Sequence, residues 1–146
     1  MNTNLQGIRR FVWVGAGIAA IALAGCAAMS SHKGVQVTLS GANEVPPVIT
    51  SASGSGRIMV GDDKSVSGSI TTTGIVATAA HIHTGAAGVN GPVTIGLTKT
   101  ADNVWAVPAD AKFTDEQYST YKAGGMYINV HSAANKPGEI RGQLLP

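Results

Sequence analysis

Apolar and polar residues alternate with a period of two in several short segments of this chain. Residues 35–39 show this pattern, and it returns over 66–72 and 139–144. Such alternation is typical of strands that bury one face. Turn-forming residues separate the segments, for example at 61–64. We therefore predict an all-β domain, an antiparallel, Greek-key-like β-sandwich or barrel.

One short helix interrupts the strand pattern. Thr114 can accept a hydrogen bond at a helix start, and Gln117 follows three residues later, as in a capping box. Gly124 and Gly125 can end the helix. The sequence therefore predicts a helix over 115–123.

The first 26 residues have the organisation of an export signal. Arg9 and Arg10 precede an uncharged apolar run of 12 residues, which is too short to span a bilayer comfortably. Leu23-Ala24-Gly25-Cys26 follows and resembles the bacterial lipobox, in which the cysteine thiol receives diacylglycerol. An ordinary signal peptide and a twin-arginine signal are the alternatives.

These features divide the chain into three parts. We predict that 1–25 is a cleaved lipoprotein signal peptide, 26–34 a lipidated flexible tether, and 35–146 a single domain. Ala27 follows Cys26, in place of the aspartate associated with retention in the inner membrane. We expect a lipid-anchored protein of the cell envelope, in the outer membrane, facing the periplasm or the cell surface.

Charge argues against nucleic acid as a partner. Without Arg9 and Arg10, eight Lys/Arg remain against eight Asp/Glu, so the formal charge of the mature chain is near zero and no basic patch is visible. No Ser-His-Asp or Cys-His arrangement stands out, so no catalytic residue is predicted. Cys26 is the only cysteine, and the domain therefore contains no disulfide.

Three of the four histidines lie in two strand-like segments. His81 and His83 are two residues apart and project from the same strand face. His131 projects opposite Ile128 and Val130, on the face away from the expected core. If the two strands are neighbours, the three imidazoles can converge on one ion on the outer side of the sheet. Neutral imidazoles suit copper, which we expect, with zinc as the alternative. Structural hydrogen bonding is the competing interpretation.

Two further polar residues can assist such a site. Glu44 precedes two prolines and can act as a carboxylate ligand or a base, or pair with a backbone amide or an arginine. Asn129 shares the face of His131 and can orient a ligand or satisfy backbone groups. His32 falls in the tether and is expected to be a solvated linker residue.

Several motifs in order resemble the CHRD domain, first described in chordin and common in bacterial exported proteins: Leu39-Ser40-Gly41-Ala42-Asn43-Glu44-Val45-Pro46-Pro47, His81-Ile82-His83-x-Gly85, Tyr127-Ile128-Asn129-Val130-His131-Ser132 and Pro137-Gly138-Glu139-Ile140-Arg141-Gly142-Gln143-Leu144. The resemblance covers about 35–146 and implies a β-rich fold but little about activity. The His-x-His strand with a later strand histidine also resembles the copper ligands of copper–zinc superoxide dismutase. The chain has no histidines placed for a bridging ligand or a zinc site, so we do not infer dismutase activity from this resemblance.

Together these features predict an exported, membrane-anchored CHRD-type domain that binds a metal ion, copper first, in envelope metal handling or electron transfer. The alternatives are a non-catalytic protein-interaction module with structural histidines and a small-molecule redox metalloenzyme.

The lipid anchor can be tested at Cys26. Cys26→Ala removes the thiol that would receive diacylglycerol, so the variant should be released from the membrane or stall in processing. The measurements are membrane partition and the mass of the mature N-terminus. Unchanged partition and an unchanged mass would exclude the anchor.

Overall fold

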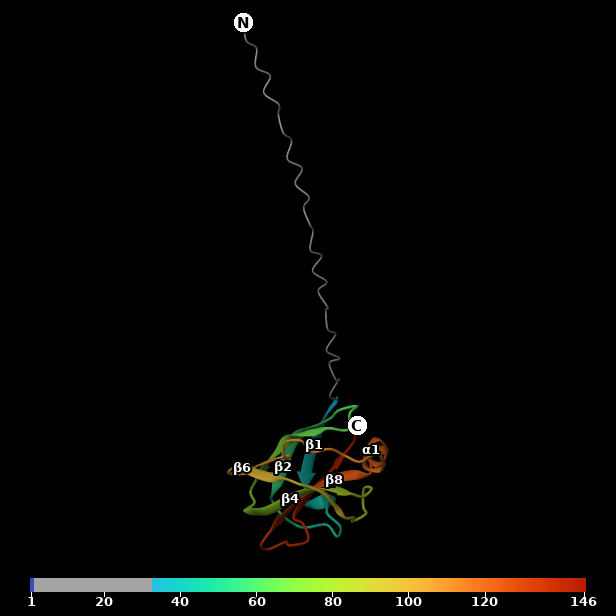
Figure 1. Ribbon diagram of the computed structural model, residues 1–146. Coiled ribbons are helices and arrows are strands. Elements are labelled where there is room, and N and C mark those ends of the chain that lie inside the picture. The colour runs from blue at the N-terminus through green and yellow to red at the C-terminus, as the bar shows by residue number, and fades with distance from the viewer. Residues whose placement is uncertain (2–32) are drawn as a thin grey trace.

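The computed structural model describes residue 1 and residues 33–146 (Figure 1). The described elements, in chain order, are β1 (Lys33–Ser40), the 3-10 helix η1 (Gly41–Asn43), β2 (Ser53–Val60), β3 (Val66–Thr73), β4 (Ala77–Thr84), β5 (Val93–Gly96), β6 (Thr98–Ala101), β7 (Val104–Ala106), α1 (Asp115–Lys122), β8 (Met126–Ser132) and β9 (Ile140–Leu144). Cys26 and the rest of the predicted lipobox lie outside the described residues. Lys33 and Gly34, which we had assigned to the tether, belong to β1. Within the described part, no helix is long and apolar enough to cross a bilayer.

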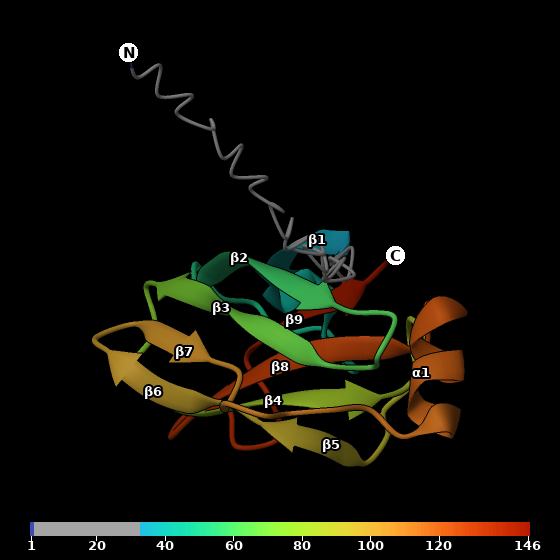
Figure 2. The ribbon, with the colours of Figure 1, turned by 45° about the horizontal axis from the view of Figure 1, so that its top comes forward.

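All the described strands belong to one antiparallel sheet, in the order β5-β4-β8-β9-β1-β2-β3-β7-β6. The sheet curls so that β2 and β3 face the layer of β4, β5 and β8 (Figure 2). The last strand, β9, lies between β8 and β1 and joins the two layers. The two edge strands, β5 and β6, are separated in the sequence by a single residue. The two edges of the sheet therefore lie near each other, and the barrel-like sheet is nearly closed. The predicted all-β antiparallel fold with one short helix is confirmed.

The core lies between the two layers. Ile58 and Ile70 of one layer and Ile82, Ile128 and Ile140 of the other are all fully buried. These are the apolar members of the two-residue alternation, so the sequence pattern identifies the inner face of the sheet.

The helix forms as the capping box predicts. The Thr114 hydroxyl accepts from the Gln117 backbone N–H, and the Gln117 side chain accepts from the Thr114 backbone N–H. Tyr121 anchors α1 to the domain by packing against Phe113, with ring centroids 5.9 Å apart. The sequence analysis did not predict β6, because Thr98–Ala101 is exposed throughout and shows no apolar alternation.

The outer face of β8 and β9 is not exposed, contrary to our expectation. Tyr127, Asn129 and Arg141 project away from the core, yet their exposed fractions are 2%, 4% and 1%. Loop 85–92 contributes to covering them, because its backbone and side chains bond to Arg141 and Tyr127. Glu139 is also buried and accepts from the Thr50 hydroxyl. The sheet therefore carries a second, polar buried layer outside the apolar core.

The core assignment predicts a large effect of truncating Ile128, which is paired with Ile82 across β4 and β8. Ile128→Ala should lower the free energy of unfolding by about 2–5 kcal/mol, because it leaves a cavity between the layers. The measurement is the midpoint of urea unfolding. Val93→Ala on exposed β5 is the control and should change stability by no more than about 0.5 kcal/mol. Equal effects of the two substitutions would contradict this assignment.

Candidate metal centre

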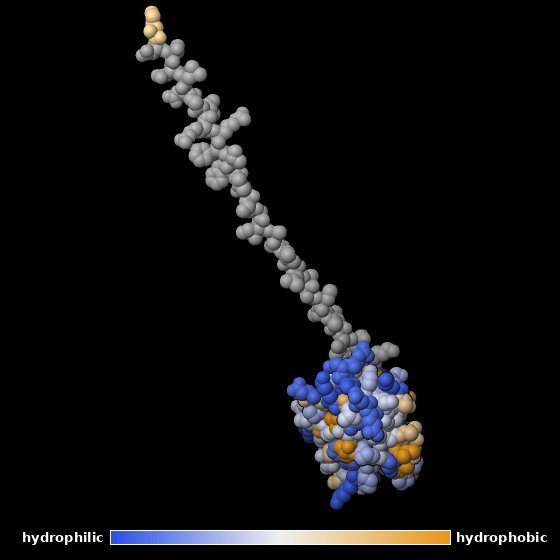
Figure 3. Space-filling view, turned by 45° about the vertical axis from the view of Figure 1, so that its right-hand side comes forward, coloured by the Kyte–Doolittle hydropathy of each residue, from blue (hydrophilic) through white to orange (hydrophobic). Residues whose placement is uncertain are grey.

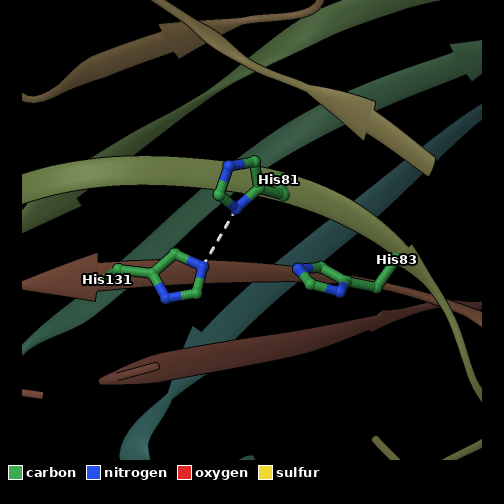
Figure 4. Close-up of side chains that lie close together, drawn as sticks. All are labelled: His81, His83 and His131. Carbon is green, nitrogen blue, oxygen red and sulfur yellow. Dashed lines mark hydrogen bonds between the residues drawn. The ribbon is translucent and has the colours of Figure 1, made fainter. Parts of the chain in front are cut away.

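The pairing of β4 with β8 brings the three predicted histidines together. These antiparallel neighbours pair His81 with Asn129, His83 with Tyr127 and Ala79 with His131. One ligand nitrogen from each histidine lies within 4.8 Å of the others. Figure 4 shows the three rings turned toward one another from the two strands. The adjacency of the strands, on which the predicted site depended, is therefore present in the fold.

Hydrogen bonds to backbone carbonyls fix which ring nitrogen is free in two of the histidines. His83 Nδ1 lies 3.0 Å from the Gly91 carbonyl oxygen, and His131 Nδ1 lies 2.8 Å from that of Lys136. A carbonyl oxygen only accepts, so both Nδ1 atoms carry the proton and each Nε2 of a neutral ring has a lone pair. His83 Nε2 is buried and has no hydrogen-bond partner among the described residues.

Within residues 33–146, the side chain of the third histidine, His81, bonds only inside the cluster. His81 Nδ1 lies 3.0 Å from His131 Nε2. Because the His131 Nε2 atom carries a lone pair, His81 Nδ1 donates in this arrangement. A tetrahedral ion with bonds of about 2.0–2.1 Å holds its nitrogen ligands about 3.4 Å apart. An ion held by His81 Nδ1, His83 Nε2 and His131 Nε2 would therefore require the rings to adjust from nitrogen separations of up to 4.8 Å.

The surroundings of His81 and His83 favour their neutral forms. Burial lowers the pKa of His81, and the neighbouring His131 and His83 lower it further. Burial also lowers the pKa of His83, although its hydrogen bond to Gly91 acts in the opposite direction. Metal ligation requires neutral imidazole, so burial favours the forms of His81 and His83 that can bind an ion.

A stacked column supports His83 from one side. The His83 and Tyr127 rings stack with centroids 4.9 Å apart and planes at 10°. Arg141 Cζ lies 3.4 Å from the centroid of Tyr127. The Gly91 N–H donates to Tyr127 Oη at 3.2 Å, while its carbonyl accepts from His83. The position and tautomer of the His83 ring are thus set by its stacking and by one glycine.

Arg141 is a residue of this site that the sequence analysis did not single out. Its Nη2 donates to the carbonyls of Ala86 and Val89 at 2.9 and 3.0 Å, and its Nη1 donates to Asn90 Oδ1 at 3.1 Å. Its alternation with Ile140 places it on the outer face of the sheet. Alternation finds the face but cannot show that a distant loop covers it.

Glu44 and Asn129 form a buried pair beside the histidines. Asn129 Nδ2 donates to Glu44 Oε1 at 2.7 Å, and Asn129 Oδ1 is buried without a hydrogen-bond partner in the described structure. Gly138 allows the pair to fit, because a Cβ atom there would lie 2.1 Å from Asn129 Nδ2. Asn129 is the strand partner of His81. Glu44 instead lies behind Asn129 and outside the three-histidine group.

Burial has the largest effect on the ionisation of the Glu44 carboxyl. It raises the pKa of the carboxyl to about 7, while Arg141 and the Val45 backbone N–H pull in the opposite direction. Glu44 and Arg141 also line an open pocket of about 460 Å³, whose other walls are mainly small apolar residues such as Ala42, Val45 and Ala87.

Comparison with known proteins identifies one family. The sequence model of the CHRD domain matches residues 35–144, which is most of the chain. No curated protein and no solved structure matches.

The buried carboxyl predicts a specific pH dependence. The pKa of Glu44 in the fold lies above its ordinary value of 4.5, so protonated Glu44 stabilises the fold fully below pH 4.5. This contribution is lost as the pH rises through about 7. Glu44→Gln keeps the shape and removes the titration. The free energy of unfolding of wild type, minus that of the variant, should therefore fall between pH 4.5 and 8. A flat difference in urea unfolding would contradict the raised pKa.

Proposed function

The chain belongs to the CHRD domain family, and from the geometry of its histidines we propose that it binds one transition-metal ion through His81, His83 and His131. Copper is the proposed ion and zinc the alternative. The proposed setting is the cell envelope, with a lipid on Cys26 as the anchor and a role in metal handling or electron transfer.

The observation that carries the proposal is the pair of imidazole lone pairs aimed into the cluster. His83 Nε2 is buried without a partner in the described structure, which costs about 1–3 kcal/mol in the metal-free protein. A metal ion would satisfy this atom. The backbone bonds at Gly91 and Lys136 are of the kind that orient histidine ligands in metal sites.

The ligand chemistry supports copper over other ions. The cluster offers three nitrogen ligands and no carboxylate, so it suits copper, zinc or nickel rather than magnesium or calcium. Among divalent first-row ions, affinity for a given site is greatest for copper. Three protein ligands also leave a position for water or an exogenous ligand.

A non-catalytic interaction module is the second candidate. The pocket between Glu44 and Arg141 can receive a side chain of a partner, and a few large apolar residues, among them Ile49 and Val89, are exposed. Figure 3 shows separate hydrophobic patches on a mainly hydrophilic face of the domain. In this case the histidines have a structural role and bind no metal.

Calorimetric titration of the tag-free protein with Cu(II) and Zn(II) separates these candidates. Wild type should bind one ion tighter than about 10 μM, and binding to the native state should raise the melting temperature. The affinity should fall below about pH 6.5, because protons compete for the imidazoles.

The double variant His81→Ala/His83→Ala should lose both binding and the thermal shift. His32→Ala is the control and should retain them, because His32, which lies outside the described residues, is predicted to be a solvated linker residue. If wild type binds neither ion at 10 μM, or if the double variant binds as well as wild type, the three-histidine site is wrong and the interaction module replaces it.

A further inference from the structure

We propose that His81 is the exchanging ligand of this centre, so that the protein delivers or accepts its ion by ligand exchange with a partner that offers a nitrogen or sulfur donor. The inference rests on the proposed metal site. It goes further because it assigns different roles to the three histidines. His83 and His131 are ligands held in a fixed position, and His81 is the ligand that dissociates from the ion and binds it again.

Two of the ligands are fixed by contacts outside the cluster. His83 bonds to the Gly91 carbonyl and is stacked on Tyr127, which in turn packs against Arg141. His131 bonds to the Lys136 carbonyl at 2.8 Å. These contacts hold both Nε2 lone pairs in place whether or not an ion is bound.

His81 has no such support. Among the described residues its one side-chain hydrogen bond is to His131 Nε2. That nitrogen is itself a ligand atom, so this bond would be lost when an ion occupies the cluster. On its other side, β5 pairs Gly96 with His81. A Cβ atom added at Gly96 would meet only His81 Cδ2 within 4 Å, at 3.9 Å. The missing side chain leaves open space beside the His81 ring at an exposed position of an edge strand.

The exchange requires no change of oxidation state. On binding, the His81 proton moves from Nδ1 to Nε2 through solvent, and the Nδ1 lone pair forms the bond to the ion. On release, the bond between the ion and His81 Nδ1 breaks as the lone pair of the incoming donor forms its own bond. Further donor atoms of the partner then displace His83 Nε2 and His131 Nε2 in the same way, and the ion leaves. His81 Nδ1 takes up a proton from solvent while Nε2 loses one, and the hydrogen bond to the freed His131 Nε2 forms again. The net charge of the protein is unchanged through the step.

The test is transfer of Cu(II) from the loaded full chain to EDTA, followed by stopped flow at increasing EDTA concentration. If His81 must open first, the transfer rate should reach a plateau set by the opening. Gly96→Val fills the open space next to the ring. It should lower the plateau about tenfold while the equilibrium affinity stays within about twofold, because it hinders movement without removing a ligand. Thr98→Val places a valine at an exposed position two residues further along the chain, in β6, and should transfer copper as wild type does.

The single histidine variants supply an independent measurement. His81→Ala should weaken Cu(II) binding by about tenfold and transfer without a plateau, whereas His83→Ala should weaken binding by about a hundredfold or more. Gly96→Val transferring at the wild-type rate, or equal losses of affinity in the two histidine variants, would overturn the assignment of His81. Failure of wild type to bind either copper or zinc would instead overturn the metal site itself.

Discussion

The buried guanidinium of Arg141 holds the polar layer of this domain together. It is 1% exposed, lies against the ring of Tyr127 and donates three hydrogen bonds to loop 85–92. A buried charge is tolerated only when it is well hydrogen-bonded, and here two carbonyl oxygens and an amide oxygen accept from three of its five N–H groups. Because carbonyl acceptors carry no full charge, Arg141 fixes the loop without an ion pair. The loop in turn carries Gly91, on which His83 depends.

The same layer explains why Glu44 behaves unlike a surface carboxylate. Arg141 attracts the charged form of Glu44, yet the pKa of Glu44 is raised, so desolvation outweighs that attraction. The guanidinium donates its hydrogen bonds to the loop, whereas the Glu44 carboxyl accepts a hydrogen bond from the Asn129 amide. Burial likewise lowers the pKa of His81 and of His83 in the neighbouring cluster. The layer therefore combines one buried guanidinium with polar groups whose charged forms are disfavoured, and the positive charge of Arg141 further disfavours protonation of His83.

The sequence predicted the parts of this fold that depend on local patterns. Alternation found the core face of most strands, the capping box found α1, and the spacing of His81 and His83 placed both rings on one face. The pairing of β4 with β8 joins segments more than 40 residues apart, so no local pattern reveals it. The burial of Tyr127 and Arg141 was missed for the same reason, since it depends on a loop from elsewhere in the chain. Residues 98–101 form a strand by pairing with β7, without any apolar alternation of their own.

Gly91 shows how the loop serves the site. A Cβ atom at this position would lie 1.7 Å from the Thr84 carbonyl oxygen, so only glycine allows the loop to approach β4 this closely. That approach brings the Gly91 carbonyl to His83 and its N–H to Tyr127. The glycine-rich loop is thus shaped to fix a histidine, and no helix follows it to form a phosphate site. His81, two residues from His83 on the same strand, lies opposite another glycine that makes no comparable contact. The asymmetry of the centre therefore arises from the backbone around it, because one glycine locks a ring and the other leaves its neighbour room to move.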